Sequence, residues 1–379
     1  MKRVGYDPDF AGAVECSASA GGQILPPVMG ATVFMLADTL GIPYIQLAIA
    51  AVLPALLYYV GVFSVVHFRA VRLNMEGSGT ERAPWFDLLK RSYLLLPLVL
   101  IVVLLVMNYT PTFAAFWGGI VSAVLLSFLR KDTRLSVEKV IKILYNAART
   151  TMSLGIATAV VGIIVGTFST TGITMIIARM IFTLTGGIKF LTLFMTMLVA
   201  MILGMGLPTS AAYVLASISA APALTMVGIE QMPAHLFVFY YGCMSTITPP
   251  VATGAYTAAG LSGGNPNRIG FHSMKLAIAG FIVPFIFIYT PQLLLTSGID
   301  LRLTVFSFVV TALGLVFLAA FFEGALMERA SVPMRLIFLA LAAALIWPDI
   351  WVSLVGLIAS IPMLVVLALK DKKKQNIPA

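Results

Sequence analysis

Long hydrophobic runs separated by short polar segments dominate the sequence. Most of these runs approach the length of about 20 residues that a helix needs to cross a bilayer. They cover residues 44–68, 92–108, 112–129, 152–168, 272–292, 303–321, 334–347 and 350–369. The pattern predicts an all-α polytopic membrane protein.

Two further hydrophobic runs, at residues 9–40 and 234–262, are interrupted by polar residues and a double proline. In the second run, the prolines at 249–250 remove two backbone donors and disfavour helical geometry in the residue before them. The helix is therefore expected to unwind near Ser245 and to restart near Val251. Because lipid cannot satisfy the carbonyl groups freed there, such a break packs against protein or lines a watery cavity, as at transporter binding sites.

Residues 188–226 predict a re-entrant hairpin. A hydrophobic run over 190–203 reaches a turn rich in glycine, proline and hydroxyl residues at 204–213, and the segment after the turn returns only to Pro222. Each arm is near or below the crossing length, so the tip is expected to stop near the midplane of the bilayer. The whole chain is then expected to make ten crossings and one hairpin.

Two other patterns occur before the hairpin. Residues 136–150 place apolar residues on one side and basic residues on the other, which predicts a separate helix along the cytoplasmic interface. Further on, the sequence Thr-Thr-Gly at 170–172 predicts a break, with a hydrophobic continuation to residue 184.

The composition agrees with membrane insertion and excludes a soluble domain. Of the 379 residues, 60% are hydrophobic and only 10% are charged, with a mean hydropathy of +1.01. The net charge of +9 could suggest nucleic-acid binding, but the basic residues lie in short loops and in the tail at 370–374, without interleaved exposed aromatic residues. Cys16 and Cys243 fall inside hydrophobic segments and are interpreted as small core residues.

The basic residues predict the orientation in the membrane. Positive charge is enriched in cytoplasmic loops. Placing the tail in the cytoplasm also places there the pairs or clusters at 69–72, 90–91, 130–134, 268–275 and 329–335. Both termini are then cytoplasmic, and Arg302 and Lys189 lie outside.

The two broken runs are one motif used twice. Val4-Gly5 precedes the double proline at 26–27 by 22 positions, and Val227-Gly228 precedes the one at 249–250 by the same 22. A Leu-Ala-Ile-Ala helix follows each copy. In the orientation above the two copies run in opposite directions, which is the inverted repeat of secondary transporters.

The hairpin at 188–226 precedes the second copy, whereas only three residues precede Val4 in the first. A first hairpin is therefore expected to be missing. We interpret the polypeptide as lacking the front of a longer transporter, so the reading frame upstream of Met1 is expected to encode a glycine- and serine-rich hairpin tip.

Four segments carry distinctive motifs. They read Ser-Ala-Gly-Gly-Gln-Ile-Leu-Pro-Pro-Val-Met-Gly (19–30), Met-Gly-Leu-Pro-Thr-Ser-Ala-Ala-Tyr (205–213), Ala-His-Leu-Phe-Val-Phe-Tyr (234–240) and Ser-Thr-Ile-Thr-Pro-Pro-Val-Ala (245–252). These motifs resemble the tripartite ATP-independent periplasmic (TRAP) transporters, specifically the fused permease subunit of the TAXI class. The resemblance implies an elevator-type, sodium-driven importer of organic acids in a bacterial or archaeal inner membrane, fed by a soluble extracytoplasmic TAXI-type binding protein.

The resemblance also implies a division of the chain. Residues 1–70 would be a remnant of the first transport-domain repeat, and 188–292 the second repeat. Residues 71–187 would be scaffold helices with an interfacial arm helix. Residues 293–379 would be additional transmembrane helices with a basic tail. The sequence departs from the family by lacking the small-subunit helices, the first scaffold helices and the first hairpin tip.

Carried over position by position, the resemblance implies one sodium site and half of another. The first would join the hairpin-tip residues Gly206, Pro208, Thr209 and Ser210 to Ser245, Thr246 and Thr248. The half-site would use Ser17, Ser19, Gly21 and Gly22. Unwound carbonyls and hydroxyls offer the oxygen dipoles that suit a hard cation. Membrane serines and threonines also often bond back to their own helix, which is the simpler interpretation of an isolated one.

The candidate substrate-binding residues are Gln23, Pro27 at the following helix start, and Thr253 at the equivalent restart in the second copy. Helix starts present free donors and partial positive charge to a carboxylate. Gln23 could equally serve to satisfy nearby backbone groups. Glu15 is the acidic residue of interest inside a predicted span.

Other functions fit the sequence less well. An intramembrane enzyme would need paired acidic residues or a serine–histidine arrangement, and none is evident. No cofactor is expected apart from sodium as the coupling ion. An ion-coupled transporter that works without a binding protein, or an ion channel, stays open as an alternative, although the inverted repeat favours alternating access over a static pore.

Overall fold

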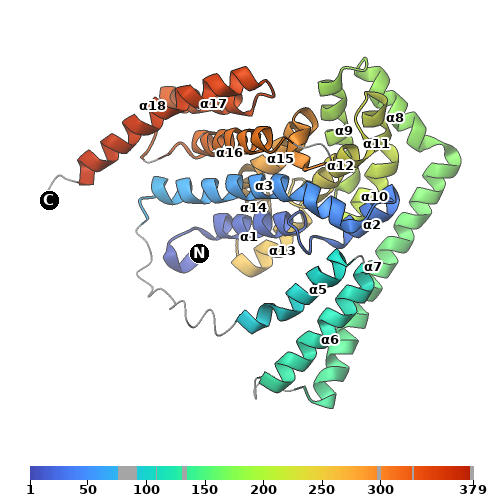
Figure 1. The fold of residues 1–379 in the computed structure, drawn as a ribbon. Coiled ribbons are helices and arrows are strands. Elements are labelled where there is room, and N and C mark those ends of the chain that lie inside the picture. The colour runs from blue at the N-terminus through green and yellow to red at the C-terminus, as the bar shows by residue number, and fades with distance from the viewer. Residues whose placement is uncertain (76–91, 108, 130–134, 297–299, 327, 376–379) are drawn as a thin grey trace.

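The computed structural model describes residues 1–75, 92–107, 109–129, 135–296, 300–326 and 328–375. These residues form helices joined by short turns (Figure 1). Their extended pairing is limited to one isolated bridge between Ala325 and Arg329, which confirms the all-α prediction. The basic segments at 90–91 and 130–134, predicted to be cytoplasmic, lie outside the described residues.

The α-helices follow one another along the chain with a few short 3₁₀ turns, marked η, between them. They are η1 (Lys2–Val4), α1 (Pro8–Gly22), α2 (Ala31–Leu40), α3 (Tyr44–Arg72), η2 (Ser92–Leu95), α5 (Leu96–Val106), α6 (Pro111–Leu129), α7 (Val137–Thr171), α8 (Ile173–Leu184), α9 (Lys189–Gly204), α10 (Thr209–Ser219), α11 (Ala221–Met226), α12 (Gln231–Ser245), α13 (Thr253–Ser262), α14 (Pro266–Leu276), α15 (Ile278–Tyr289), η4 (Pro291–Leu294), α16 (Leu301–Glu323), α17 (Val332–Ile346) and α18 (Ile350–Gln375).

Both predicted breaks at the double prolines are present. The first run stops at Gly22 and resumes at Ala31, and the second stops at Ser245 and resumes at Thr253, two residues after the predicted restart. In each linker a glycine amide beyond the prolines donates back to a carbonyl before them. Gly30 N–H reaches the carbonyl of Gln23 at 2.9 Å, and Gly254 N–H reaches that of Thr246 at 2.8 Å. Each linker therefore closes into a compact loop that satisfies part of its own backbone.

The hairpin predicted over 188–226 is formed by α9 and α10, which pack against each other. Pro222 does not end the returning arm, contrary to the prediction, because it lies in the first turn of α11, where a helix needs no amide donor. The arm continues to Met226. Residues 204–210 form the tip between the two arms, and we call this segment the hairpin tip.

The predicted end of an interfacial helix near residue 150 is wrong, because α7 runs without interruption over 35 residues. The hydroxyls of Thr150 and Thr151 donate to carbonyls one turn earlier at 3.0 and 2.9 Å, and no glycine or proline occurs in α7 before Gly155. The amphipathic part and the apolar part thus form one continuous helix. The predicted break at Gly172 is confirmed: this glycine has φ 71°, and α7 and α8 meet there at a bend of 71°.

Four helical segments in the described residues are long and apolar enough to cross a membrane, or five if the bent α7–α8 pair counts as one span. The four are Tyr44–Arg72, Thr209–Met226, Pro266–Tyr289 and Leu301–Glu323. Shorter apolar helices of 10–17 residues make up most of the other predicted spans. The total of ten crossings stays a prediction, because the length of a broken or short helix does not decide whether it crosses the membrane.

The long helix α3 lies at the centre of the fold (Figure 1), with α1, α15 and α16 packed along it. The two broken runs interleave, because α1 contacts α13 while α12 contacts α2. Small residues allow a close approach between α3 and α15: a Cβ added at Gly61 would lie 2.4 Å from the Cβ of Ala279. The two unwound linkers are thereby held near each other in the interior.

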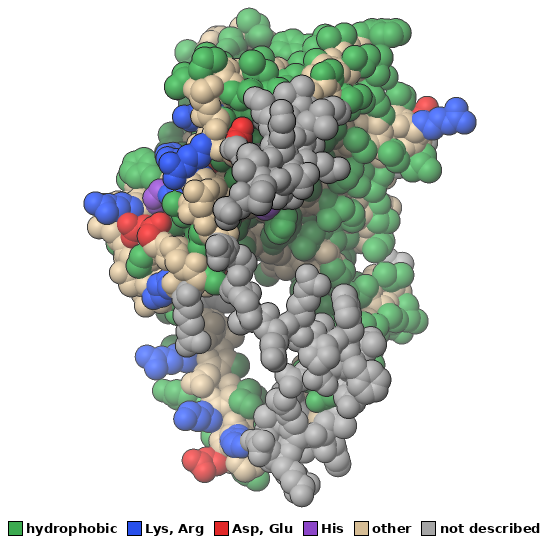
Figure 2. Space-filling model, turned by 90° about the vertical axis from the view of Figure 1, so that its left-hand side faces the viewer, with side chains coloured by type: hydrophobic (Ala, Val, Ile, Leu, Met, Phe, Trp, Pro, Cys, Tyr) green, Lys and Arg blue, Asp and Glu red, His purple; other side chains and the backbone are tan. Residues whose placement is uncertain are grey.

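Large apolar side chains cover much of the outer surface, as expected of helices that face lipid or other membrane-embedded helices. Phe116 on α6 is 62% exposed and Ile163 on α7 is 71% exposed. Figure 2 faces the end of the molecule at which α3 finishes, and there Lys and Arg side chains gather along one side of the view. Most of the other described side chains in this view are apolar.

Candidate functional site

The two unwound linkers open onto one pocket of about 340 Å³, which we call the break pocket. Its lining comes from α1, from both linkers and from α13: Glu15, Cys16, Ser19, Ala20, Gln23, Thr246, Ile247, Thr253, Gly254, Thr257, Ala258 and Leu261. The structure therefore brings together Gln23 and Thr253, which are 230 positions apart in the sequence. Pro27 is not in this lining, and its carbonyl accepts a hydrogen bond from the Tyr44 hydroxyl at 2.7 Å.

Hydroxyl and amide groups give the break pocket its polarity. The thiol of Cys243 lies 3.9 Å from Gln23 Oε1, and the Ser19 hydroxyl lies 3.5 Å from a carboxylate oxygen of Glu15. Glu15 is the acidic residue of this lining, which contains no lysine, arginine or histidine. Thr257, which was not among the predicted site residues, lies one helical turn after Thr253 on the same face of α13, so helix periodicity could have identified it.

The hairpin tip lies against the second linker. Ser245 Oγ is 3.2 Å from the carbonyl oxygen of Gly204 and 2.8 Å from that of Gly242. A Cβ at Gly204 would lie 2.5 Å from Ser245 Oγ, and one at Gly206 would lie 3.3 Å from a Val251 methyl group. Glycines in the tip therefore permit a close backbone approach to the break.

The predicted sodium ligands of the second repeat differ in burial and in the hydrogen bonds that they make. Thr246 Oγ1 donates to the carbonyl of Cys243 and Thr248 Oγ1 to that of Met244, each at 2.7 Å. A hydroxyl that donates one bond keeps its oxygen lone pairs for a cation. Thr209 and Ser210 are the last two residues of the hairpin tip, begin α10 and are half-buried.

In the described part of the chain, no group of three or more His, Cys, Asp or Glu side chains could hold a metal ion. Any cation site at the breaks would consist of hydroxyl and carbonyl oxygens, which suit a hard monovalent cation.

The four residues of the predicted first-repeat half-site do not face one point. Ser17 is buried and donates to the carbonyl of Ser273 on α14 at 3.2 Å, and Gly21, one turn later, is also buried. Ser19 and Gly22 are exposed on the other side of α1. The helix end thus has a face packed in the core and a face open to the break pocket.

Two tyrosines of α3, which were not predicted as part of the site, satisfy carbonyls near the end of α1. Tyr58 donates to the carbonyl of Ser17 at 2.7 Å and Tyr59 to that of Ala18 at 3.0 Å. A signal existed in the sequence, since a tyrosine buried in a hydrophobic helix needs a partner for its hydroxyl. These bonds fix the position of the first break relative to α3.

Replacing Gly21 by alanine is expected to destabilise the fold by about 1–3 kcal/mol, the usual range for overpacking. The added Cβ would lie 2.4 Å from the Tyr58 ring and 3.0 Å from the Tyr59 ring. Gly22→Ala is the matched control, because its Cβ would have no neighbour closer than the Tyr59 hydroxyl at 4.0 Å. Thermal unfolding in detergent should separate the two variants, and equal stabilities would contradict the tight contact between α1 and α3.

Comparison with protein families finds that residues 1–300 match the family described as the tripartite ATP-independent periplasmic transporter, DctM component. The matched range contains both broken runs, the hairpin and the whole break pocket. It ends just before α16. No curated protein matches the chain.

Proposed function

Because this chain belongs to the DctM family of tripartite ATP-independent periplasmic transporters, we propose that it imports an organic acid across a bacterial or archaeal inner membrane by sodium symport. The observation that supports this most directly is the break pocket of about 340 Å³, which is built from both broken helices. Pockets between discontinuous helices are typical of the substrate sites of secondary transporters.

The substrate would bind in the break pocket. Thr253 begins α13, and the partial positive charge of this helix start would attract a carboxylate. The amides of residues 254–256 already donate to the carbonyls of Thr246 and Ala252, so the attraction would come from the charge of the helix start and from the Thr253 hydroxyl. Gln23 lines the same pocket from the opposite linker and can donate through its amide nitrogen. We propose that an extracytoplasmic binding protein of the TAXI type delivers the acid, and that the present chain is a TAXI-class permease.

Sodium would bind where the hairpin tip meets the second linker. Ser245, Thr246 and Thr248 would offer hydroxyl oxygens at the start of the second linker, where the Ser245 hydroxyl reaches the Gly204 carbonyl of the tip. Residues 1–70 and 188–292 would form the moving transport domain, and 71–187 the scaffold against which it moves. The close fit at Gly204 gives a reason why ion occupancy would affect the position of the hairpin.

We expect Thr209→Ala or Thr248→Ala to raise the sodium concentration for half-maximal uptake several-fold or more. Each change removes one candidate oxygen ligand while leaving Pro208 and the double proline in place. Losing a ligand to a cation should cost more than the roughly 1 kcal/mol of a neutral hydrogen bond. The measurement is uptake by the complete transport system in proteoliposomes across a series of sodium gradients.

Thr167→Ala provides the matched control for these variants. Its hydroxyl donates to the carbonyl of Ile163 at 2.8 Å, the same kind of bond as that of Thr248, but on the exposed surface of α7. The control should keep the wild-type sodium dependence. If the two site variants did so as well while remaining folded, the hydroxyls would have only a structural role and the sodium site would have to lie elsewhere.

A further inference from the structure

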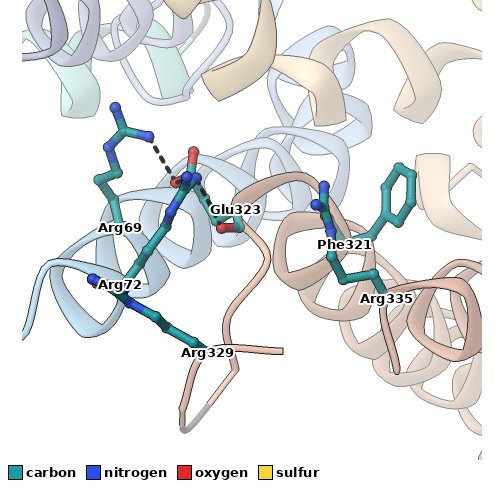
Figure 3. Close-up of polar contacts among 6 residues, drawn as sticks. All are labelled: Arg69, Arg72, Phe321, Glu323, Arg329 and Arg335. Carbon is teal, nitrogen blue, oxygen red and sulfur yellow. Dashed lines mark hydrogen bonds and ion pairs between the residues drawn. The ribbon is translucent and has the colours of Figure 1, made fainter. Parts of the chain in front are cut away.

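A cluster of arginines surrounds the point where α3 and α16 end (Figure 3). Gly324, with φ 67°, ends α16, and the amide of Ala330 donates back to the Gly324 carbonyl at 2.8 Å. The intervening loop is thus a closed turn that leads into α17. This turn places Arg329 beside the end of α3.

Glu323 is the buried centre of the cluster, with only 6% of its side chain exposed. Its carboxylate lies 3.2 Å from Arg69 and 4.0 Å from Arg72, and Arg72 also donates to the backbone carbonyl of Glu323 at 3.2 Å. Figure 3 shows Arg69 and Arg72 of α3 reaching Glu323 of α16. The ion pair therefore joins two helices that are distant in sequence.

The other two arginines are positioned by backbone carbonyls. Arg329 donates through Nε to the carbonyl of Arg72 at 3.1 Å, and Arg335 donates through Nε to that of Phe321 at 3.0 Å. Arg335 also lies over the Phe321 ring, 5.6 Å from its centre. These contacts fix the two side chains through one nitrogen each and leave further guanidinium N–H groups available for another acceptor.

A pocket of about 360 Å³, which we call the arginine pocket, lies among these groups. Arg72, Arg329 and Arg335 line it together with Glu323 and Gly324. Among the residues that line this pocket, three are arginines and one, Glu323, is acidic. Positive charge in excess around a cavity attracts an anion, and planar guanidinium groups match the oxygens of a phosphate in pairs.

We propose that the arginine pocket binds the phosphodiester headgroup of an anionic phospholipid. The phosphate chemistry alone would also suit inorganic phosphate, but an apolar track begins at the pocket. Leu73 in its lining is 46% exposed, and Val332 and Leu336, one turn apart on α17 beside Arg335, are 69% and 58% exposed. Acyl chains can lie along this track while the headgroup stays with the arginines, as in other basic pockets between membrane helices.

The proposed lipid would connect two parts of the chain. Arg72 belongs to the range that matches the transporter family, whereas Arg329 and Arg335 lie beyond residue 300. A headgroup held by all three arginines would stabilise the docking of the additional C-terminal helices on α3. This role does not depend on the proposed transport activity.

Native mass spectrometry of the purified 379-residue chain in a neutral detergent tests the proposal. The delipidated protein is titrated with dioleoylphosphatidylglycerol, with dioleoylphosphatidylcholine, and with inorganic phosphate as a competitor. We expect the anionic lipid to bind at least about tenfold more tightly than the zwitterionic one, and the Arg329→Gln/Arg335→Gln variant to lose about tenfold or more of that affinity. Arg302→Gln, at the opposite end of α16, should bind like the wild type.

Arg329→Gln alone keeps the test valid if the double variant does not fold, because Arg329 is exposed and its glutamine replacement can still donate a hydrogen bond to the Arg72 carbonyl. This single change should still weaken phosphatidylglycerol binding several-fold. Equal affinity of wild type and folded variants would overturn the proposal. Displacement of the lipid by inorganic phosphate at comparable concentration would also overturn it, because the pocket would then be a site for free anions.

Discussion

Uptake is expected to fall by about a hundredfold or more when Thr253 is replaced by tryptophan. The indole would project into the break pocket of about 340 Å³, whose walls come from α1, α13 and the two linkers, which are closed on themselves by the Gly30 and Gly254 amides. Because these hydrogen bonds hold the linkers in place, the pocket cannot easily expand to accommodate the indole. Overpacking a site costs about 3 kcal/mol at the upper end of its usual range, which corresponds to roughly a hundredfold in binding. The measurement is initial uptake by the complete transport system in proteoliposomes.

Two variants serve as controls for the tryptophan substitution. Thr253→Ser keeps the hydroxyl and the helix start and should transport nearly normally. Tyr256→Trp puts the same bulky ring on α13 at a position that is 55% exposed and outside the pocket lining, so it should also be tolerated. Normal uptake by a folded Thr253→Trp protein would show that the substrate does not pass through the break pocket, and the proposed function would lose its main support.

The breaks could be predicted from the sequence because their causes are local. A proline lacks its own donor and restricts the residue before it, so the double proline at 249–250 marked the end of α12 to within a residue. The same holds for Gly172, whose positive φ separates α7 from α8. The continuity of α7 past residue 150 was missed for a related reason: a change of surface character along a helix does not interrupt its backbone hydrogen bonds.

The partners of the break could not be predicted, since they depend on long-range packing. Nothing near Ser17 indicates that Tyr58 will bond to its carbonyl, or that Ser273, 256 positions away, will accept from its hydroxyl. The repeat did indicate that Thr253 lies at the restart equivalent to the helix start after Pro27, and the structure adds that Thr253 and Gln23 face one pocket. It also shows that Ser17 and Ser19 point to different surroundings, as residues two positions apart on a helix do.

The ion pair of Glu323 could not be found from the sequence either, because Arg69 is 254 positions away from it. We expect Glu323→Ala to destabilise the fold by about 3 kcal/mol. Removing one partner of a buried pair typically costs about 3–5 kcal/mol, because the other charge is left without compensation. The lower end applies here, because the side chain of Arg69 is 20% exposed and can be partly solvated, while Arg72 is more exposed still at 48%.

Thermal unfolding of the purified chain in detergent, with Glu230→Ala as the control, measures this effect. Glu230 precedes α12 as an exposed carboxylate that makes no side-chain cap bond, so its removal should change stability by less than about 0.5 kcal/mol. Glu323→Ala also removes the acceptor that holds Arg69 and Arg72 at the end of α16, so α16 should loosen from α3 before the rest of the fold unfolds. If the two alanine variants had the same stability, the Arg69–Glu323 pair would not stabilise the α3–α16 contact, and apolar packing between these helices would have to account for it.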